Sequence, residues 1–165
     1  YLDLTMIERY WGQERFYHHT APISMVYALR EALCIIAEEG LEARWARPEL
    51  NAKAFTAGCE AMGLKPFAQE GYHLPSLVTL WVPEGVQDAA VRQHLLKEFN
   101  LEISGGLGPV KGQIWRVGLM GSNSTRKNIM LALTALSSAL NAQGFKASAS
   151  AGLEAATAVY DVAGK

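Results

Sequence analysis

Leu77-Val78-Thr79-Leu80-Trp81-Val82 is a run of aliphatic, aromatic and β-branched residues that lies between Pro75 and Pro83. Such residues favour extended backbone, and the flanking prolines limit the segment at each end. A second segment of the same kind, Gln113-Ile114-Trp115-Arg116-Val117-Gly118-Leu119, lies further along the chain. We expect both segments to be strands of a sheet in which neighbours pair antiparallel.

Apolar residues recur at helical spacing in the segments around these strands. The predicted helices begin at Pro22 with Gly40 near the end, cover residues 46–62, cover residues 88–100, and begin again at about Thr125. Thr20 and Asp88 are candidate caps. Residues 64–67 and 101–103 are weaker strand candidates, and the aromatic-rich residues 1–20 are expected to form a folded loop. Helices mixed with strands predict an α/β sandwich with a mixed or antiparallel sheet.

Composition excludes several classes of protein. Half of the 165 residues are hydrophobic and 19% are charged, which is too apolar for a disordered chain. The net charge of −1 argues against nucleic acid or an anionic membrane surface as a partner, and charged residues interrupt every long apolar segment. The two cysteines, Cys34 and Cys59, are too few for a disulfide framework, so we expect a reducing, cytoplasmic compartment.

The first candidate for chemistry is Tyr17-His18-His19-Thr20, directly before a predicted helix. Adjacent histidines point in different directions on almost any backbone, so we predict no metal site here. The Tyr17 and Thr20 hydroxyls can instead donate hydrogen bonds to a phosphate without adding charge. The alternative is that Thr20 only caps the helix.

The second candidate is the loop Gly105-Gly106-Leu107-Gly108-Pro109 together with Arg116. The loop does not match the dinucleotide-binding fingerprint, because it opens no helix, and it lacks the residues of a Walker loop. Arg116 lies in an otherwise apolar strand, where a guanidinium either faces solvent or pairs with an anion. Its planar fork suits a carboxylate, which it can bind with two hydrogen bonds.

Four ordered motifs carry a resemblance to a known family: Tyr17-His18-His19-Thr20-Ala21-Pro22, Leu29-Arg30-Glu31-Ala32-Leu33, the glycine loop, and Arg116-Val117-Gly118-Leu119-Met120-Gly121. From Tyr1 to about Leu140 the chain resembles the C-terminal part of class V pyridoxal-phosphate aminotransferases. Within this class it is most similar to the alanine:glyoxylate and serine:glyoxylate enzymes. The order and separation of the motifs make the resemblance specific.

The resemblance implies a homodimeric protein of fold type I. It assigns residues 1–45 to the end of the large cofactor domain and a connecting helix, and residues 46–143 to the small C-terminal α/β domain. Residues 144–165 are then an Ala/Ser-rich tail, either a frayed helix or disordered. By the same resemblance Tyr17 and Thr20 bind the phosphate of pyridoxal 5'-phosphate held by the neighbouring subunit, and Arg116 binds the carboxylate of amino-acid and 2-oxo-acid substrates.

The Schiff-base lysine of the family has no counterpart among the lysines here, so no catalytic residue is assigned. We therefore expect this chain, which begins at Tyr1 rather than Met, to be an inactive piece of an enzyme that transfers the amino group of alanine or serine to glyoxylate. The alternative is a non-catalytic α/β module for binding or dimerisation. A cysteine desulfurase is disfavoured because residues 83–115, ahead of Arg116, contain no cysteine.

Overall fold

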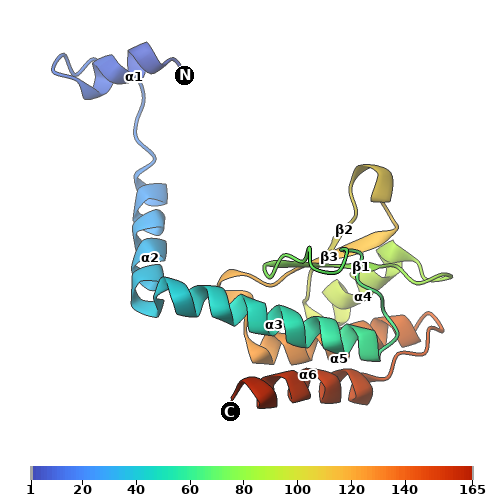
Figure 1. Cartoon of the computed structure of the whole chain (residues 1–165). Helices are drawn as coiled ribbons and strands as arrows, with labels where there is room; N and C mark the ends of the chain where they lie inside the picture. The colour runs from blue at the N-terminus through green and yellow to red at the C-terminus, as the bar shows by residue number, and fades with distance from the viewer. Residues whose placement is uncertain (1, 165) are drawn as a thin grey trace. The chain divides into compact units, whose positions relative to one another are not determined.

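A computed structural model describes residues 2–164 (Figure 1). The chain divides into two compact units, of which the first ends at Leu41 and the second begins at Glu42. No helix within residues 2–164 is long and apolar enough to cross a membrane.

The first unit begins with a short helix, α1 (Leu4–Trp11). The Asp3 carboxylate caps it by accepting hydrogen bonds from the backbone N–H groups of Thr5 at 2.9 Å and Met6 at 3.4 Å. The prediction that residues 1–20 form only a loop is therefore wrong at this point. An aspartate at the N-cap is the sequence signal that indicates the helix, because its oxygens satisfy N–H groups that have no partner within the helix.

The second helix of this unit, α2 (Ile23–Glu39), confirms the helix predicted from Pro22. It ends at Gly40, whose φ of +80° is open to glycine at little cost. Pro22 occupies the N-cap position and makes no side-chain capping bond, so Thr20 is not the cap. Many large apolar side chains of α2 are exposed to solvent in this chain, namely Ile23, Met25, Val26, Tyr27, Leu29, Leu33 and Ile35.

The second unit contains a three-stranded antiparallel sheet in the order β1-β3-β2. Its strands are β1 (Leu77–Trp81), β2 (Ser104–Gly105) and β3 (Ile114–Gly118). The segments predicted at residues 77–82 and 113–119 are therefore neighbouring strands, and the predicted antiparallel α/β architecture is confirmed. The central strand β3 places Arg116 opposite Thr79 of β1 and Ser104 of β2.

Four helices complete the second unit: α3 (Leu41–Ala61), α4 (Asp88–Phe99), α5 (Arg126–Asn141) and α6 (Ala149–Ala163). Figure 1 shows α3, α5 and α6 side by side on one side of the sheet. Trp115 and Val117 of β3 are buried in one core with apolar residues of these helices. The α5 residues predicted from periodicity all lie in that core, namely Ile129, Leu133, Leu136 and Leu140.

Some boundaries differ from the predictions. Helix α3 begins at Leu41 rather than at residue 46. Residues 101–103 are not a strand: α4 ends at Asn100 in the left-handed conformation, with a φ of +50°, and the Leu101 N–H bonds the Leu95 carbonyl at 3.1 Å. Because the chain after α4 takes part in this C-terminal cap, it does not form a strand ahead of β2. Residues 64–67 form a single bridge between Pro66 and Leu80 rather than a strand, consistent with the missing N–H of proline.

The segment 144–165, for which a frayed helix or disorder was expected, contains the packed helix α6, and the disordered alternative is wrong. Gly152, Ala156 and Tyr160 are its buried residues. A Cβ atom built on Gly58 of α3 would lie 2.8 Å from the Gly152 carbonyl oxygen. The absence of a side chain at Gly58 therefore lets α3 and α6 approach closely.

A buried polar chain joins α6, α3 and the loop before α5. The Tyr160 hydroxyl donates to Asn51 Oδ1 at 2.7 Å, and Asn51 Nδ2 donates to Ser124 Oγ at 2.9 Å. Burial raises the pKa of Tyr160, so the hydroxyl keeps its proton as a donor. The buried side chains of Tyr160, Asn51 and Ser124 thus satisfy one another, as a low-polarity interior requires.

Replacing Tyr160 by Phe should lower the free energy of unfolding by about 1–3 kcal/mol, because Asn51 Oδ1 loses its donor in a buried place. Urea denaturation followed by circular dichroism measures this change. The matched control is Tyr72→Phe, which removes a hydroxyl from a side chain that is 77% exposed. Equal effects of the two substitutions would show that the buried bond contributes nothing specific.

Candidate functional site

The hydroxyls of Tyr17 and Thr20 lie 2.8 Å apart in the segment between α1 and α2. Both side chains are exposed, and that of Tyr17 is 66% exposed. In such a pair one hydroxyl donates to the other, which leaves one proton free to donate to a ligand. The sequence singled out these two residues, and the structure brings their hydroxyls together.

The histidines between them contribute aromatic contacts. The rings of His18 and His19 have their centroids 5.0 Å apart, and the ring of Tyr10 from α1 lies 5.6 Å from that of His19. Within residues 2–164, no group of three or more His, Cys, Asp or Glu side chains is arranged to hold a metal ion. In this segment the rings of Tyr10, His18 and His19 therefore lie around the paired hydroxyls of Tyr17 and Thr20.

Arg116 lies at the centre of β3 and is partly buried. Side chains alternate along a strand, so Arg116 lies on the face opposite to Trp115 and Val117. Its Nε donates to the Gly105 carbonyl at 2.9 Å. Among the described residues its terminal nitrogens have no hydrogen-bond partner. The guanidinium is thus held at one nitrogen and leaves the pair of terminal nitrogens for an anion.

The glycine loop turns the chain from β2 back into β3. The Gly106 N–H bonds the Ile114 carbonyl at 2.9 Å, and a Cβ atom on Gly106 would lie only 2.0 Å from the Val110 carbonyl oxygen. Only glycine fits here. The loop leads into a short 3₁₀ turn, Gly108–Val110, and then into a strand, so it has no helix at which a phosphate could sit. Its contribution to the site is the Gly105 carbonyl that holds Arg116.

Asp88 makes contacts next to Arg116 that sequence reasoning missed. Gln87 rather than Asp88 occupies the N-cap of α4, so the predicted cap is wrong. The Asp88 carboxylate instead accepts hydrogen bonds from Arg92 Nε at 2.8 Å and from Trp115 Nε1 at 3.0 Å. The bond to Asp88 raises the pKa of Arg92. The four-residue spacing of Asp88 and Arg92 on one helix indicates their ion pair from the sequence alone. The bond from Trp115, the neighbour of Arg116, joins residues far apart in the chain and could not be predicted from such spacing.

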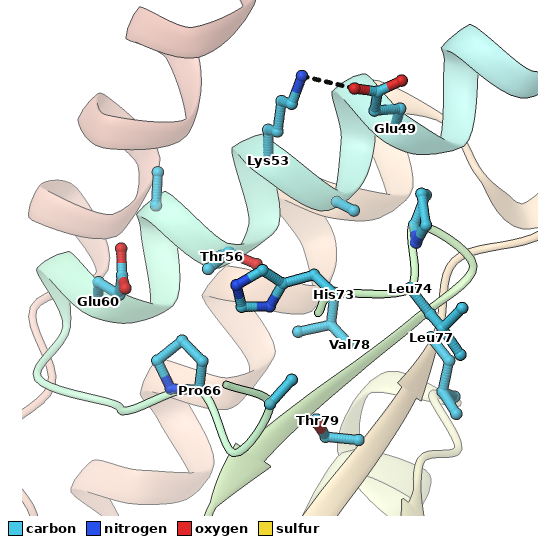
Figure 2. Close-up of a pocket in the computed structure, with 14 residues that line it drawn as sticks. Glu49, Lys53, Thr56, Glu60, Pro66, His73, Leu74, Leu77, Val78 and Thr79 are labelled. Atoms are coloured by element: carbon cyan, nitrogen blue, oxygen red, sulfur yellow. Dashed lines mark hydrogen bonds and ion pairs between the residues drawn. The ribbon is translucent and has the colours of Figure 1, made fainter. Parts of the chain in front are cut away.

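A cavity of about 360 Å³ in the second unit lies between α3, β1 and the loop before β1 (Figure 2). Its wall is mostly apolar and carries the Lys53–Glu49 ion pair, 2.7 Å long, and His73. Figure 2 shows the His73 ring close to Thr56 and Val78. Tyr17, Thr20 and Arg116 do not line this cavity. Sequence reasoning did not find it, because its lining comes from distant segments of ordinary composition.

Comparison with known proteins identifies relatives along the whole chain, although no family model matches it. The (S)-ureidoglycine–glyoxylate transaminase of Bacillus subtilis is 38% identical over 165 residues, which is 100% of this chain and 40% of that protein. The alanine–glyoxylate aminotransferase of Callithrix jacchus is 41% identical over 145 residues, or 85% of this chain and 35% of that protein. This chain is homologous to the glyoxylate aminotransferases. It spans about two fifths of the length of these relatives.

Solved structures agree with this aminotransferase homology. The ureidoglycine–glyoxylate aminotransferase from Bacillus subtilis superimposes with a TM-score of 0.89 at 37% identity, over 96% of this chain and 41% of that one. The pyridoxamine–pyruvate aminotransferase from Mesorhizobium loti gives 0.88 at 36% identity, over 98% of this chain and 42% of that one. The predicted fold class, a small α/β domain that matches part of the aminotransferase fold, is confirmed.

Cys59 should be unreactive in the folded protein. It is fully buried in α3, and burial raises the pKa of its thiol, so almost no thiolate forms near neutral pH. Treatment of the native protein with a thiol reagent, followed by peptide mapping, should leave the Cys59 peptide unmodified. The same treatment in denaturant should modify it fully. Rapid modification of Cys59 in the native protein would contradict its placement in the core.

Proposed function

We propose that this chain is part of a pyridoxal-phosphate-dependent aminotransferase that moves the amino group of alanine or serine to glyoxylate. The observation that carries the proposal is the state of Arg116, whose guanidinium is held by the Gly105 carbonyl while its terminal nitrogens have no partner among the described residues. The relatives named for transamination with glyoxylate supply the reaction class. Amino-acid and 2-oxo-acid substrates share one group, the carboxylate, which such a fork recognises.

In this proposal Arg116 orients the substrate rather than exchanging protons with it. Two parallel hydrogen bonds to a carboxylate fix both the position and the plane of that group, so the carbon that carries the amino or oxo group is presented in one orientation. The choice between alanine and serine as donor depends on other parts of the substrate pocket, to which Arg116 does not contribute.

Tyr17 and Thr20 are proposed to hold the cofactor phosphate of the neighbouring subunit in a homodimer. The paired hydroxyls fit a phosphate oxygen because they offer a donor and add no charge. Bound pyridoxal phosphate supplies the electron sink for amino-group transfer. The exposed apolar side chains of α2 support an assembly that covers this helix in the whole protein.

The Schiff-base lysine is proposed to lie outside this chain, which alone would then be inactive. Both cysteines are free thiols, which favours the cytoplasm as the compartment. The alternative, a non-catalytic α/β module, draws on the complete core of the second unit. The two proposals differ in whether the protein that contains this chain transaminates glyoxylate at all.

Replacing Arg116 by Ala in the whole protein should lower kcat/KM for alanine and glyoxylate roughly a hundredfold or more, because a charge-assisted double contact is lost. Arg116→Lys should recover only part of the activity, since a lysine cannot form the paired contact. The readout that tests the clamp itself is the preference for glyoxylate over an aldehyde without a carboxylate, which should collapse in Arg116→Ala.

The matched control is Lys111→Ala, which removes an exposed cation from the same β2–β3 connection and should leave the kinetics unchanged. An Arg116→Ala variant that keeps its kcat/KM and its preference for glyoxylate would overturn the clamp. Absence of any transamination in the wild-type protein would favour the non-catalytic module.

A further inference from the structure

The segment that carries the hydroxyl pair folds back onto α1. The Phe16 N–H bonds the Arg9 carbonyl at 3.2 Å, and the Arg9 guanidinium lies 4.7 Å from the centre of the Phe16 ring. Arg9 also forms an ion pair with Glu14 at 3.1 Å. These contacts hold the residues directly before Tyr17 against α1. Helix α1 therefore serves as the support of the segment.

Tyr10 is the residue of α1 that reaches the hydroxyl segment at two points. Its ring meets that of Tyr17 edge to face, with centroids 5.9 Å apart and an angle of 88° between the planes. Its ring also lies 5.6 Å from the ring of His19, the residue before Thr20. Tyr10 thus touches both arms of the turn that brings the Tyr17 and Thr20 hydroxyls together.

We propose that Tyr10 is a positioning residue for phosphate binding, because its ring fixes the Tyr17 side chain in the orientation that meets Thr20. This inference rests on the proposed function of Tyr17 and Thr20. The Tyr17 side chain is 66% exposed, and an exposed side chain without a brace samples several rotamers. A ligand that needs one rotamer then binds more weakly, since binding must first order the side chain. An edge-to-face contact supplies that order in advance.

The role of Tyr10 belongs to its ring and not to its hydroxyl. Among the described residues the Tyr10 hydroxyl has no hydrogen-bond partner, whereas the ring makes both contacts. Tyr10→Phe should therefore preserve the site, and Tyr10→Ala should loosen it. This difference separates a positioning ring from a further phosphate ligand.

The experiment uses the whole protein freed of cofactor and measures equilibrium dissociation constants for pyridoxal phosphate and for pyridoxal, which lacks the phosphate. Tyr10→Ala should weaken pyridoxal phosphate on the order of three- to tenfold, the range of an aromatic pair, and should leave pyridoxal unchanged. Tyr10→Leu should behave like Tyr10→Ala and keeps helix propensity and apolar bulk if the alanine variant does not fold. Tyr10→Phe should match the wild type for both ligands.

Tyr17→Phe and Thr20→Ala separate this inference from the function on which it rests. Both should reduce the preference for pyridoxal phosphate over pyridoxal. If they do and Tyr10→Ala and Tyr10→Leu do not, the positioning role is overturned and the phosphate site stands. If neither changes the preference, the phosphate assignment itself fails. Equal weakening of both ligands in Tyr10→Ala, or a Tyr10→Phe variant as weak as Tyr10→Ala, would also overturn the inference.

Discussion

The burial of Trp115 and Val117 in the central strand β3 is the constraint on which the position of Arg116 depends. Trp115 and Val117 must be buried against the helices, so strand alternation places the residue between them on the opposite face. Pairing on both sides, with Thr79 and Ser104 as register partners, fixes its backbone. A guanidinium whose main chain and Nε are both held needs little further ordering when an anion arrives.

The surrounding hydrogen bonds extend this constraint to both ends of β3. Asp88 accepts a bond from the indole of Trp115 and so ties the strand to the first turn of α4. Beyond the strand, Arg47 donates to the carbonyls of Gly121 at 2.9 Å and Ser124 at 2.8 Å. The side chain of Ser124 is joined through Asn51 to α6. Helices from both ends of the unit thus hold the chain that carries the arginine.

Local periodicity was sufficient to predict β1, β3, α4 and α5, because their apolar faces are written in consecutive residues. It was not sufficient for the contacts of Asp88, Asn51 and Tyr160, since each joins segments far apart in the chain. Helix α6 was also hard to predict. It packs against α3 by close approach at glycine residues, so its sequence shows little apolar periodicity. The motif Tyr17–Thr20 could be located from sequence, but the 2.8 Å approach of its hydroxyls required the structure.

The two candidate binding elements rest on different kinds of support. Arg116 belongs to a unit with its own apolar core, so its geometry follows from the folding of that unit. The helices of the first unit bury no residue within the described chain, so Tyr17 and Thr20 owe their arrangement to a few local contacts with α1. Where a core is absent, individual ring contacts decide side-chain orientation, because no surrounding packing restricts the rotamers. An arginine built into a sheet and a hydroxyl pair in an exposed segment between two helices are therefore expected to respond differently to mutation: the first through folding of the unit, the second through local order alone.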